Sequence, residues 1–313
     1  MEKTQQTEAT LEQQETVRAS APGRSLLNRL GIVVSLFALY FIWGSTYLGM
    51  RIALEGLPPF IMSGIRFLIA GTVLYGYLRI RREPNPRRGQ WLGAALIGLL
   101  LVVGGNGGVT FAEQWVASGL AAVAVGAMPL WAALFIGLMG RWPARLEWIG
   151  LLLGFTGVIL LNLGNGIWAT PIGAISLLLA PMCWALGSAL ATRLSLPKGL
   201  MSSAIQMLTG GVVMLIISQL LGEHVSHLPT PRSLLALAYL IIFGSLVAYS
   251  AYGYLLRKVR PALATSYAYV NPAVALLLGA FMANEPITLM GVLAMLIILT
   301  GVGLVSLGRG RGK

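Results

Sequence analysis

Aspartate is absent from this 313-residue sequence, and glutamate supplies all ten of its acidic residues. Charged residues of both signs make up only 10% of the chain, whereas about 25% is usual for a soluble domain, whose surface must be solvated by water. Hydrophobic residues account for 57%. The composition therefore argues against a water-soluble protein, and we expect most of the surface to face lipid.

Metal and cofactor chemistry has few residues to build on. Cys183 is the only cysteine, so the chain can form neither an intrachain disulfide nor a cysteine-built metal site. The two histidines, His224 and His227, share a predicted loop, where such a pair is more often solvated than bound to a metal. No GxxxxGK[ST] motif is present, so we expect no nucleotide hydrolysis by the chain itself. The sequence thus predicts no metal, no cofactor and no catalytic residue.

The formal net charge of +12 is the feature that would suggest nucleic-acid binding. The basic residues, however, recur between apolar runs instead of forming one surface, so nucleic acid is not an expected partner. Each apolar run is close to the roughly 20 residues that a helix needs to cross a bilayer. The runs cover about residues 31–53, 59–80, 90–112, 117–139, 146–164, 170–192, 199–221, 233–256, 262–283 and 288–307.

The basic residues lie in alternate connections between these runs. If the N-terminus is inside, the cytoplasmic side receives every lysine and arginine except Arg51, Arg66 and Arg232, as the positive-inside rule requires. Both termini are then cytoplasmic, which demands an even number of spans, and ten fits. Residues 1–29 are polar and lack the apolar segment of a cleaved signal, so they are predicted to form a disordered cytoplasmic tail. Residues 309–313 are predicted to form a short C-terminal tail.

The two halves of the sequence resemble each other at an offset of about 141 to 144 residues. IWGSTYLGMR at 42–51 matches CWALGSALATR at 183–193, and VASGLAAVAVGAMP at 116–129 parallels VRPALATSYAYVNP at 259–272. Each half holds five runs, and because five is odd, the second half must be inverted relative to the first. The predicted fold is an all-α membrane protein of ten transmembrane helices, arranged as two inverted five-helix repeats around a central cavity. The repeats are expected at 30–164 and 165–308.

Several motifs resemble those of the EamA-type branch of the drug/metabolite transporter superfamily. They are WGSTYLGMRIALEGLPP (43–59), Arg66–Phe67, GNGGVTFAEQ (105–114), the proline-containing span 119–139, WALGS (184–188) and RPALATSYAYVNPAVALLLG (260–279), followed by Glu285. The resemblance covers about residues 30–307. It implies ten helices in two repeats, a central cavity, a bacterial inner-membrane location, and export of metabolites, amino acids or drug-like compounds. It does not identify the substrate, because members of the superfamily differ widely.

Arg66 is the most informative single residue, because a charged side chain inside a span is costly and usually meets a partner or a water-filled cavity. Its guanidinium either attracts a substrate carboxylate or phosphate, or clamps Glu55, Glu113 or free backbone carbonyls. Asn106 lies within the GGNGG stretch at 104–108. The glycines favour close helix packing, while the Asn106 amide is a candidate for the cavity wall because an unpaired amide in lipid is costly.

Aromatic and polar side chains deep in the spans are further candidates for substrate binding. A cavity for flat or apolar substrates and simple packing between helices both account for the aromatic residues. The polar residues either bind substrate or bridge helices. These candidates are Trp43, Tyr47, Trp131, Trp184, Tyr252 and Tyr267, with Ser188, Gln206 and Asn271 among the polar residues. Pro129 and Pro272, in spans four and nine, are candidate kinks or gating points.

No span has an acidic residue near its centre, which disfavours the deep-carboxylate antiport of small multidrug transporters. Glu113, at the outer end of span three, is the best candidate for proton coupling, and facilitated diffusion is equally open.

The predicted function is a secondary transporter that exports small metabolites by alternating access. Its expected partners are a small-molecule substrate and the lipid bilayer, with a proton as a candidate. A passive channel and a membrane-embedded enzyme are the alternatives, although span-buried serines such as Ser45 and Ser250 lack activating neighbours.

Overall fold

The structure is a computed structural model that describes residues 22–140, 142, 144–164, 170–259 and 266–310. This part of the chain is built of helices and contains no β-strand. The first helix begins at Pro22, so the last residues of the predicted N-terminal tail are helical, and the final helix extends to Gly310. The remainder of the two predicted tails, residues 1–21 and 311–313, lies outside the described residues.

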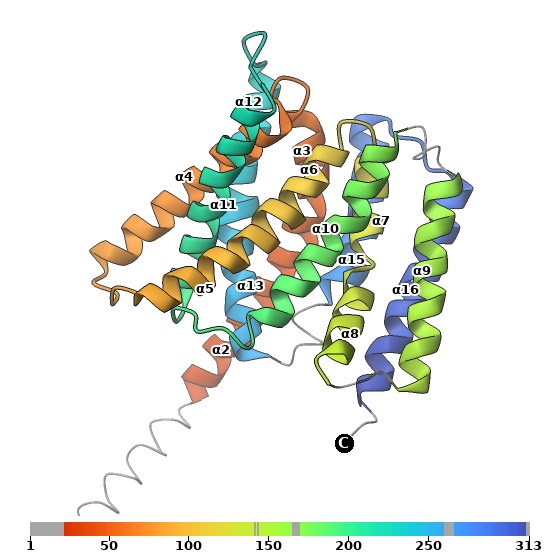
Figure 1. Cartoon of the computed structure of the whole chain (residues 1–313), viewed down its shortest axis with the longest axis horizontal. Coiled ribbons are helices and arrows are strands. Elements are labelled where there is room, and N and C mark those ends of the chain that lie inside the picture. Colours follow the sequence, from red (N-terminus) through yellow and green to blue (C-terminus); the bar gives the residue numbers. More distant parts are fainter. Residues whose placement is uncertain (1–21, 141, 143, 165–169, 260–265, 311–313) are drawn as a thin grey trace, which may run out of the picture.

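The helical segments follow the predicted apolar runs, and several runs consist of two or three segments joined end to end (Figure 1). In chain order the segments are α2 (Pro22–Phe37), η1 (Ala38–Trp43), α3 (Gly44–Ala53), α4 (Pro59–Ile80), α5 (Arg88–Gly98), η2 (Leu99–Gly107), α6 (Gly108–Ala112), α7 (Ser118–Val125), α8 (Met128–Leu138), α9 (Arg145–Gly164), α10 (Pro171–Leu190), α11 (Leu200–Leu220), α12 (Pro231–Tyr239), η4 (Leu240–Val247), α13 (Ala248–Lys258), α15 (Tyr267–Ala283) and α16 (Leu289–Gly310).

Seven stretches of the described chain are long and apolar enough to cross a membrane. The helical class and the presence of several spans are therefore confirmed, while the number ten and the inverted repeat stay predictions. The seven stretches are Asn28–Ala53, Pro59–Ile80, Arg88–Ala112, Ser118–Phe135, Pro171–Leu190, Leu200–Leu220 and Pro231–Leu255. Three other long helices, α9, α15 and α16, pack beside them.

In the described part of the chain, three spans contain a stretch of π-helix, η1, η2 and η4, in which hydrogen bonds join residues five apart. The segment η4 begins at Leu240, 141 positions after the start of η2 at Leu99, which is the offset between the similar halves of the sequence. Most of the GGNGG stretch lies in η2, so the helix continues through these glycines as a wider π-helix and does not break. Such turns are frequent at functional sites.

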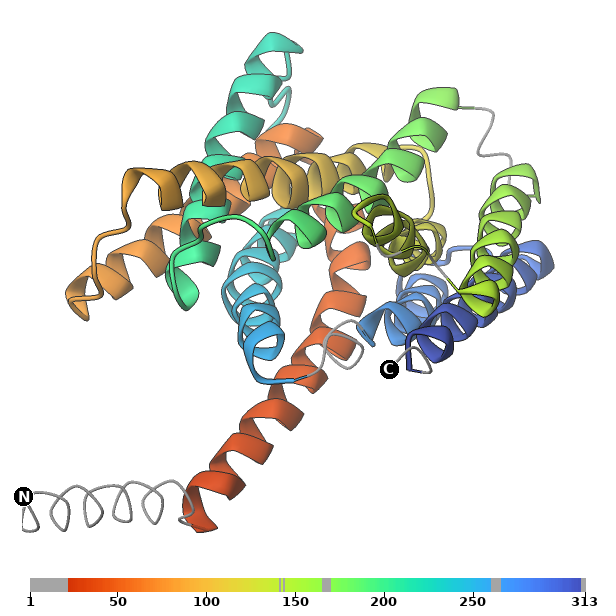
Figure 2. The same cartoon turned by 60° about the horizontal axis from the view of Figure 1, so that its bottom comes forward.

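Two helix pairs, α4 with α11 and α9 with α16, pack with their backbones very close together (Figures 1 and 2). Glycine permits this approach. A Cβ atom on Gly71 would lie 2.7 Å from the backbone nitrogen of Leu208, and one on Gly211 would lie 2.5 Å from that of Leu68. A Cβ atom on Gly301 of α16 would lie 2.6 Å from backbone atoms of α9. Because backbone cannot yield as a side chain does, each pair is a rigid unit.

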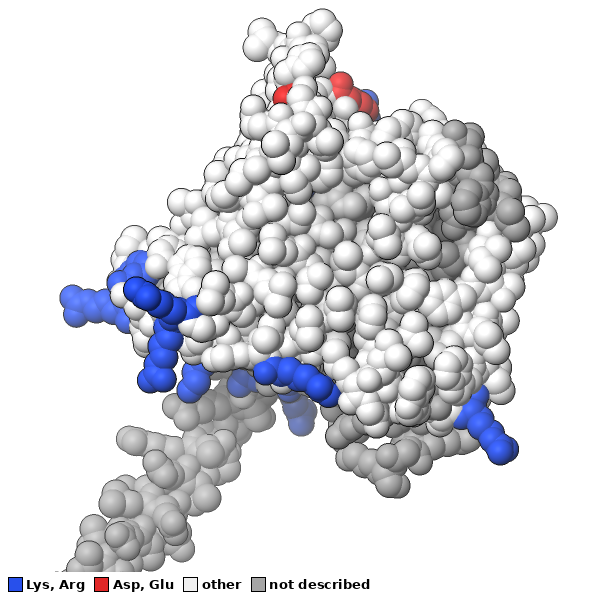
Figure 3. Space-filling model, viewed as in Figure 1, with Lys and Arg blue, Asp and Glu red and all other residues white. Residues whose placement is uncertain are grey.

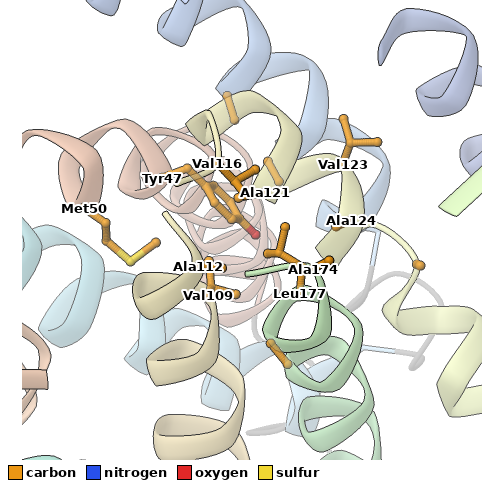
Figure 4. Close-up of a cluster of buried hydrophobic side chains, with 14 of the residues drawn as sticks. Tyr47, Met50, Val109, Ala112, Val116, Ala121, Val123, Ala124, Ala174 and Leu177 are labelled. Atoms are coloured by element: carbon orange, nitrogen blue, oxygen red, sulfur yellow. The ribbon is translucent and has the colours of Figure 1, made fainter. Parts of the chain in front are cut away.

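Helices α3, α6, α7, α10 and α15 lie between the two rigid pairs (Figure 1). Buried apolar side chains fill the space between them at one end, where the Tyr47 ring of α3 points toward α6, α7 and α10 (Figure 4). We call these residues the apolar seal, since their packing closes this end of the central helices to water. The apolar seal consists of Tyr47, Met50, Val109, Ala112, Val116, Ala121, Val123, Ala124, Ala174 and Leu177.

Charged side chains divide between the two ends of the molecule. The visible lysine and arginine side chains gather at the end where α2 begins and α16 finishes, below an uncharged belt (Figure 3). At the other end, beside α12, the exposed side chains of Arg232 and Glu55 approach to 3.8 Å. We call these the basic end and the seal end. An apolar belt between charged ends is the pattern expected of a protein that spans a bilayer.

Candidate functional site

A cavity of about 60 Å³ lies between the central helices, directly below the apolar seal. It is bounded by segments from both halves of the chain, which is where solute sites of membrane carriers are usually found. Its wall is mainly apolar and aromatic, with a few polar groups, as is typical of small-molecule sites. The lining residues are Trp43, Thr46, Tyr47, Met50, Arg66, Gly105, Asn106, Val109, Val125, Met128, Ala180, Pro181, Trp184, Tyr267 and Asn271.

Seven of the predicted substrate-binding residues line this cavity. They are Trp43, Tyr47, Arg66, Asn106, Trp184, Tyr267 and Asn271. The other four predicted residues, Trp131, Ser188, Gln206 and Tyr252, are not among the lining residues. A buried polar group needs a partner, and the partner indicates what the group does.

Arg66 is buried, with 2% of its surface exposed. Its Nε donates to the hydroxyl of Ser245 at 2.8 Å, and its Cζ lies 4.6 Å from the centre of the Phe67 ring. Within the part of the chain that the structure describes, one terminal nitrogen, Nη1, has no hydrogen-bond partner. Within the described residues, no carboxylate lies within ion-pair distance of Arg66, and the carboxylate of Glu55 is paired with Arg232 instead. A fixed, charged donor is thus left free beside the cavity.

The amides of Asn271 and Gln206 are occupied in joining helices. In the orientation that satisfies its surroundings, the Asn271 amide nitrogen donates to the carbonyl oxygens of Leu39 at 2.9 Å and Tyr40 at 3.1 Å. The Gln206 amide accepts from the hydroxyl of Tyr249 at 2.7 Å. Asn271 therefore ties α15 to the first span, and Gln206 ties α11 to α13. Asn106, by contrast, is a half-buried residue of the cavity wall.

The aromatic residues are organised around Trp43. Its indole nitrogen donates to the carbonyl oxygen of Gly244 at 3.0 Å, which fixes the ring plane. The ring centres of Trp184, Tyr252 and Tyr267 lie 5.7, 5.3 and 5.1 Å from that of Trp43. Edge-to-face and tilted pairs at these distances are favourable. Tyr252 therefore supports the wall from behind, beside Ser188, while the other three rings form the wall itself.

Trp131 and the two predicted kink residues lie near the cavity without lining it. The Trp131 ring packs edge-on against Phe155, with 4.8 Å between ring centres, and so faces α9. Pro129 stands in the first turn of α8, just after a turn at Gly126 that interrupts span four. Pro272 lies inside α15, and a Cβ on Gly126 would meet its Cγ at 3.2 Å. The two proline-containing segments are therefore neighbours.

Glu113 follows Ala112, the last residue of its span, and is completely buried. Neither carboxylate oxygen has a hydrogen-bond partner among the described residues, while its backbone oxygen accepts a hydrogen bond from the guanidinium of Arg51. Burial raises the pKa of the Glu113 carboxyl well above its usual range, and the nearby carboxylate of Glu285 raises it further. Arg51 and Arg66 oppose this shift without outweighing it. Glu113 is thus a carboxyl group that favours its neutral, protonated form.

Two other glutamates, Glu223 and Glu285, hold helix ends together, a role that sequence reasoning missed. The Glu223 carboxylate accepts backbone N–H bonds from Phe60 at 3.1 Å and Ile61 at 2.9 Å, at the start of α4. The Glu285 carboxylate accepts from the backbone nitrogens of Ser118 at 2.9 Å and Gly119 at 3.2 Å, at the start of α7. The first N–H groups of a helix have no partner within it, so a carboxylate satisfies them well.

The same local structure places both carboxylates. Each glutamate follows a residue in the left-handed region, Gly222 with φ 70° or Asn284 with φ 53°. The backbone nitrogen of the glutamate then bonds back into the helix, to Ser218 at 2.9 Å or to Gly279 at 3.1 Å. This helix-ending turn directs the side chain toward the neighbouring helix. The sequence signal that could have indicated these clamps is a Gly-Glu or Asn-Glu pair directly after an apolar run.

Comparison with known proteins agrees with this architecture. The chain is 48% identical over 287 residues to a protein of Escherichia coli strain K12 named uncharacterized inner membrane transporter YedA, covering 91% of this chain and 93% of that one. It is 27% identical to the uncharacterized transporter YvbV of Bacillus subtilis, covering 86% and 89% of the two chains. A crystal structure with 18% sequence identity superposes with a TM-score of 0.65 over 90% of this chain and 99% of that chain, and so shares the fold.

The model of the EamA-like transporter family matches residues 30–163 and 171–307, once in each half of the chain. Since nearly the whole chain is matched, the protein belongs to the EamA-like transporter family.

Proposed function

We propose that the protein is a secondary transporter that exports small metabolites across the inner membrane by alternating access. In this proposal α9, α15 and α16 also cross the bilayer, which completes ten spans in two inverted repeats. The matching π-helical segments η2 and η4, 141 positions apart, support the duplication. The basic end and both termini face the cytoplasm, in accordance with the positive-inside rule.

The observation that carries this proposal is the free donor of Arg66 at a cavity walled by aromatic rings. A buried arginine without a carboxylate partner is unfavourable by itself and favourable when an anionic group completes its hydrogen bonds. The walls of Trp43, Trp184 and Tyr267 suit a flat or apolar body. The site is therefore matched to amino acids or amphiphilic drug-like compounds that carry a carboxylate.

Counterflow into proteoliposomes tests this function. The purified full chain is reconstituted, the vesicles are loaded with an unlabelled compound, and uptake of the labelled compound is followed for a panel of amino acids and amphiphilic drugs. We expect saturable uptake of one carboxylate-bearing class, competed by its analogues. Flux that rises in proportion to concentration without exchange would indicate a channel. Chemical conversion of a panel compound by the protein in detergent would indicate an enzyme.

We propose Glu113 as the proton-binding group, should transport be coupled to protons. The charged or titratable groups that act on it are Glu285, Arg51 and Arg66, with Tyr47 facing it from α3. Glu113 stays neutral while the seal end is closed, and it can ionise when opening of that end exposes it to water. Proton binding at Glu113 thus favours the closed seal end.

The variant Glu113→Gln is expected to remove a pH dependence from transport. Because the pKa of Glu113 is raised, the neutral form prevails at low pH and is lost as the pH rises through that pKa. The counterflow rate of the unchanged protein should therefore fall toward alkaline pH, whereas the glutamine variant, neutral at every pH, should give a flat profile. Initial rates measured from mildly acidic to alkaline pH decide this. Equal slopes for the two proteins would reject Glu113 as the coupling group.

A further inference from the structure

The two glutamate clamps at the seal end join very different pairs of helices. Glu223 joins α11 to α4, one of the rigid pairs, whose backbones are already in contact at Gly71 and Gly211. Glu285 joins α15 to α7. Both carboxylates are half-buried and accept two backbone N–H groups of the helix they hold. The clamps share these backbone bonds and differ in the helices they join and in a further bond from the Ser118 hydroxyl to Glu285.

The contact between α7 and α15 has the features of a joint at which one helix can move relative to the other. Span four is interrupted by the turn at Gly126 between α7 and α8, and α15 contains Pro272, which leaves a backbone carbonyl without its usual helical partner. The segment α7 also supplies Ala121, Val123 and Ala124 to the apolar seal. Tilting α7 away from the centre would therefore open the seal end of the cavity. A Cβ on Gly119 of α7 would lie 3.0 Å from the Cα of Leu276 in α15, whereas α4 and α11 approach more closely, at 2.7 Å at Gly71 and 2.5 Å at Gly211.

The carboxylate of Glu285 sits in a space made for it. Besides the two backbone N–H groups, the hydroxyl of Ser118 donates to it at 2.9 Å, and Ser118 is fully buried. Gly279 lies directly below, where a Cβ atom would collide with the carboxylate. Hydrogen bonds to a charged acceptor are among the stronger ones in proteins. They are also short-range, so a small movement of α7 abolishes all three together.

At the basic end, Glu83 occupies a position like that of Glu223. Glu83 follows α4 and the left-handed residue Arg82, with φ 59°, just as Glu223 follows α11 and Gly222. Its backbone nitrogen makes the same bond back into the helix, to Leu78 at 3.0 Å. Among the described residues, however, no hydrogen bond joins the Glu83 carboxylate to the start of α11. The glutamates that follow α4 and α11 therefore differ: in the described part of the chain, Glu223 holds the start of the neighbouring helix and Glu83 does not.

From these contacts we infer that Glu285 is the latch of the outer gate, by which we mean the residue that keeps the seal end closed. Its carboxylate holds α7 against α15, and the seal end opens when these bonds break. This inference rests on the proposed transport function for its purpose, although the latch itself is a statement about conformation. Glu285 acts through α7 and does not touch the substrate, so it is a positioning residue. Glu223 is the matched clamp without a gating role.

The test measures access to the apolar seal directly. In a background carrying Cys183→Ala, the substitution Ala121→Cys places a thiol where the native residue is fully buried. Reaction with a membrane-impermeant maleimide, added from the outside to cells or right-side-out vesicles, reports how often the seal end opens. The comparison is between this background, the same with Glu285→Gln, and the same with Glu223→Gln. No substrate is needed.

We expect Glu285→Gln to raise the labelling rate by roughly tenfold or more, because a neutral amide replaces a charged acceptor. Glu223→Gln should change the rate less than twofold, since α4 and α11 remain locked by their glycine contacts. Ser118→Ala removes one of the three bonds and keeps the charge, so it should give an intermediate labelling rate. It replaces Glu285→Gln in the comparison if the glutamine variant folds poorly. Equal labelling of Glu285→Gln and its background, or equal increases for Glu285→Gln and Glu223→Gln, would overturn the latch.

The result is separable from the transport assay. If the unchanged protein moves no compound in counterflow but Glu285→Gln labels faster, the latch stands and the proposed substrate or function fails. If counterflow succeeds and the two glutamine variants label alike, transport stands and the latch fails.

Discussion

Replacing Arg66 with alanine is expected to reduce saturable transport by roughly 10- to 100-fold in kcat/KM while leaving folded protein in the membrane. The reason is that the free Nη1 supplies a charge-assisted hydrogen bond to the substrate carboxylate, and a bond to a charged group contributes about 1.5–3 kcal/mol. The measurement is the initial rate of counterflow across substrate concentrations, at matched amounts of reconstituted protein.

Two companion variants separate binding from architecture. Arg66→Lys keeps the positive charge but loses the planar guanidinium, so activity should be partly retained. Ser245→Ala removes the partner that holds Nε at 2.8 Å and leaves the charge in place, so the loss should be only severalfold. The extraction yield and size-exclusion profile in mild detergent report folding. If Arg66→Ala instead depletes the folded protein and Arg66→Lys does not restore it, the residue is a structural clamp.

Replacing Gly71 with alanine is expected to cost about 1–3 kcal/mol of stability, the usual cost of forcing an extra group into a packed interior. The added methyl group would lie 2.7 Å from the backbone nitrogen of Leu208 and 3.1 Å from the backbone oxygen of Ala204. Neither atom can swing aside, so α4 must move away from α11. A lower midpoint of thermal unfolding in detergent, followed by fluorescence or by retention of the monodisperse peak, measures the effect.

The same helix provides the matched control. A Cβ atom on Gly76, also in α4, would meet no atom within 4 Å. Alanine has a higher helix propensity than glycine, so Gly76→Ala should be neutral or stabilising by up to about 1 kcal/mol. A comparable loss of stability in both variants would show that α4 tolerates no change at any glycine, and the close approach at Gly71 would then not be the cause.

The apolar runs predicted the helices well because one physical requirement, burying about 20 residues in hydrocarbon, determines where a span can begin and end. What they could not show is the local winding of each helix. The π-helical segments η1, η2 and η4 depend on how neighbouring helices pack, and the interruption of span four at Gly126 lies three residues before the proline that suggested a kink there. The helical tail segment 22–29 was likewise not apparent from polar composition.

The cavity residues were predictable to the extent that polar or aromatic character inside a span is itself unusual. Arg66 and Asn106 meet this condition, and both line the cavity. Gln206 meets it as well, yet its amide is used by Tyr249, because sequence shows that a side chain is buried but not which neighbour it faces. The glutamate clamps were missed for a related reason. Glu285 bonds to backbone N–H groups of Ser118 and Gly119, whose availability depends on packing between distant segments and not on residue type.

The close contact between α4 and α11 has a consequence for synthesis of the chain. About 140 residues separate Gly71 from Gly211, so at roughly 5–20 residues per second a ribosome needs on the order of 7 to 28 seconds to complete the partner of α4. During this interval the glycine-lined face of α4 is in contact with lipid or with the insertion machinery. The first half of the molecule is therefore an assembly intermediate, and two separately produced halves should accumulate only when both are made in the same cell.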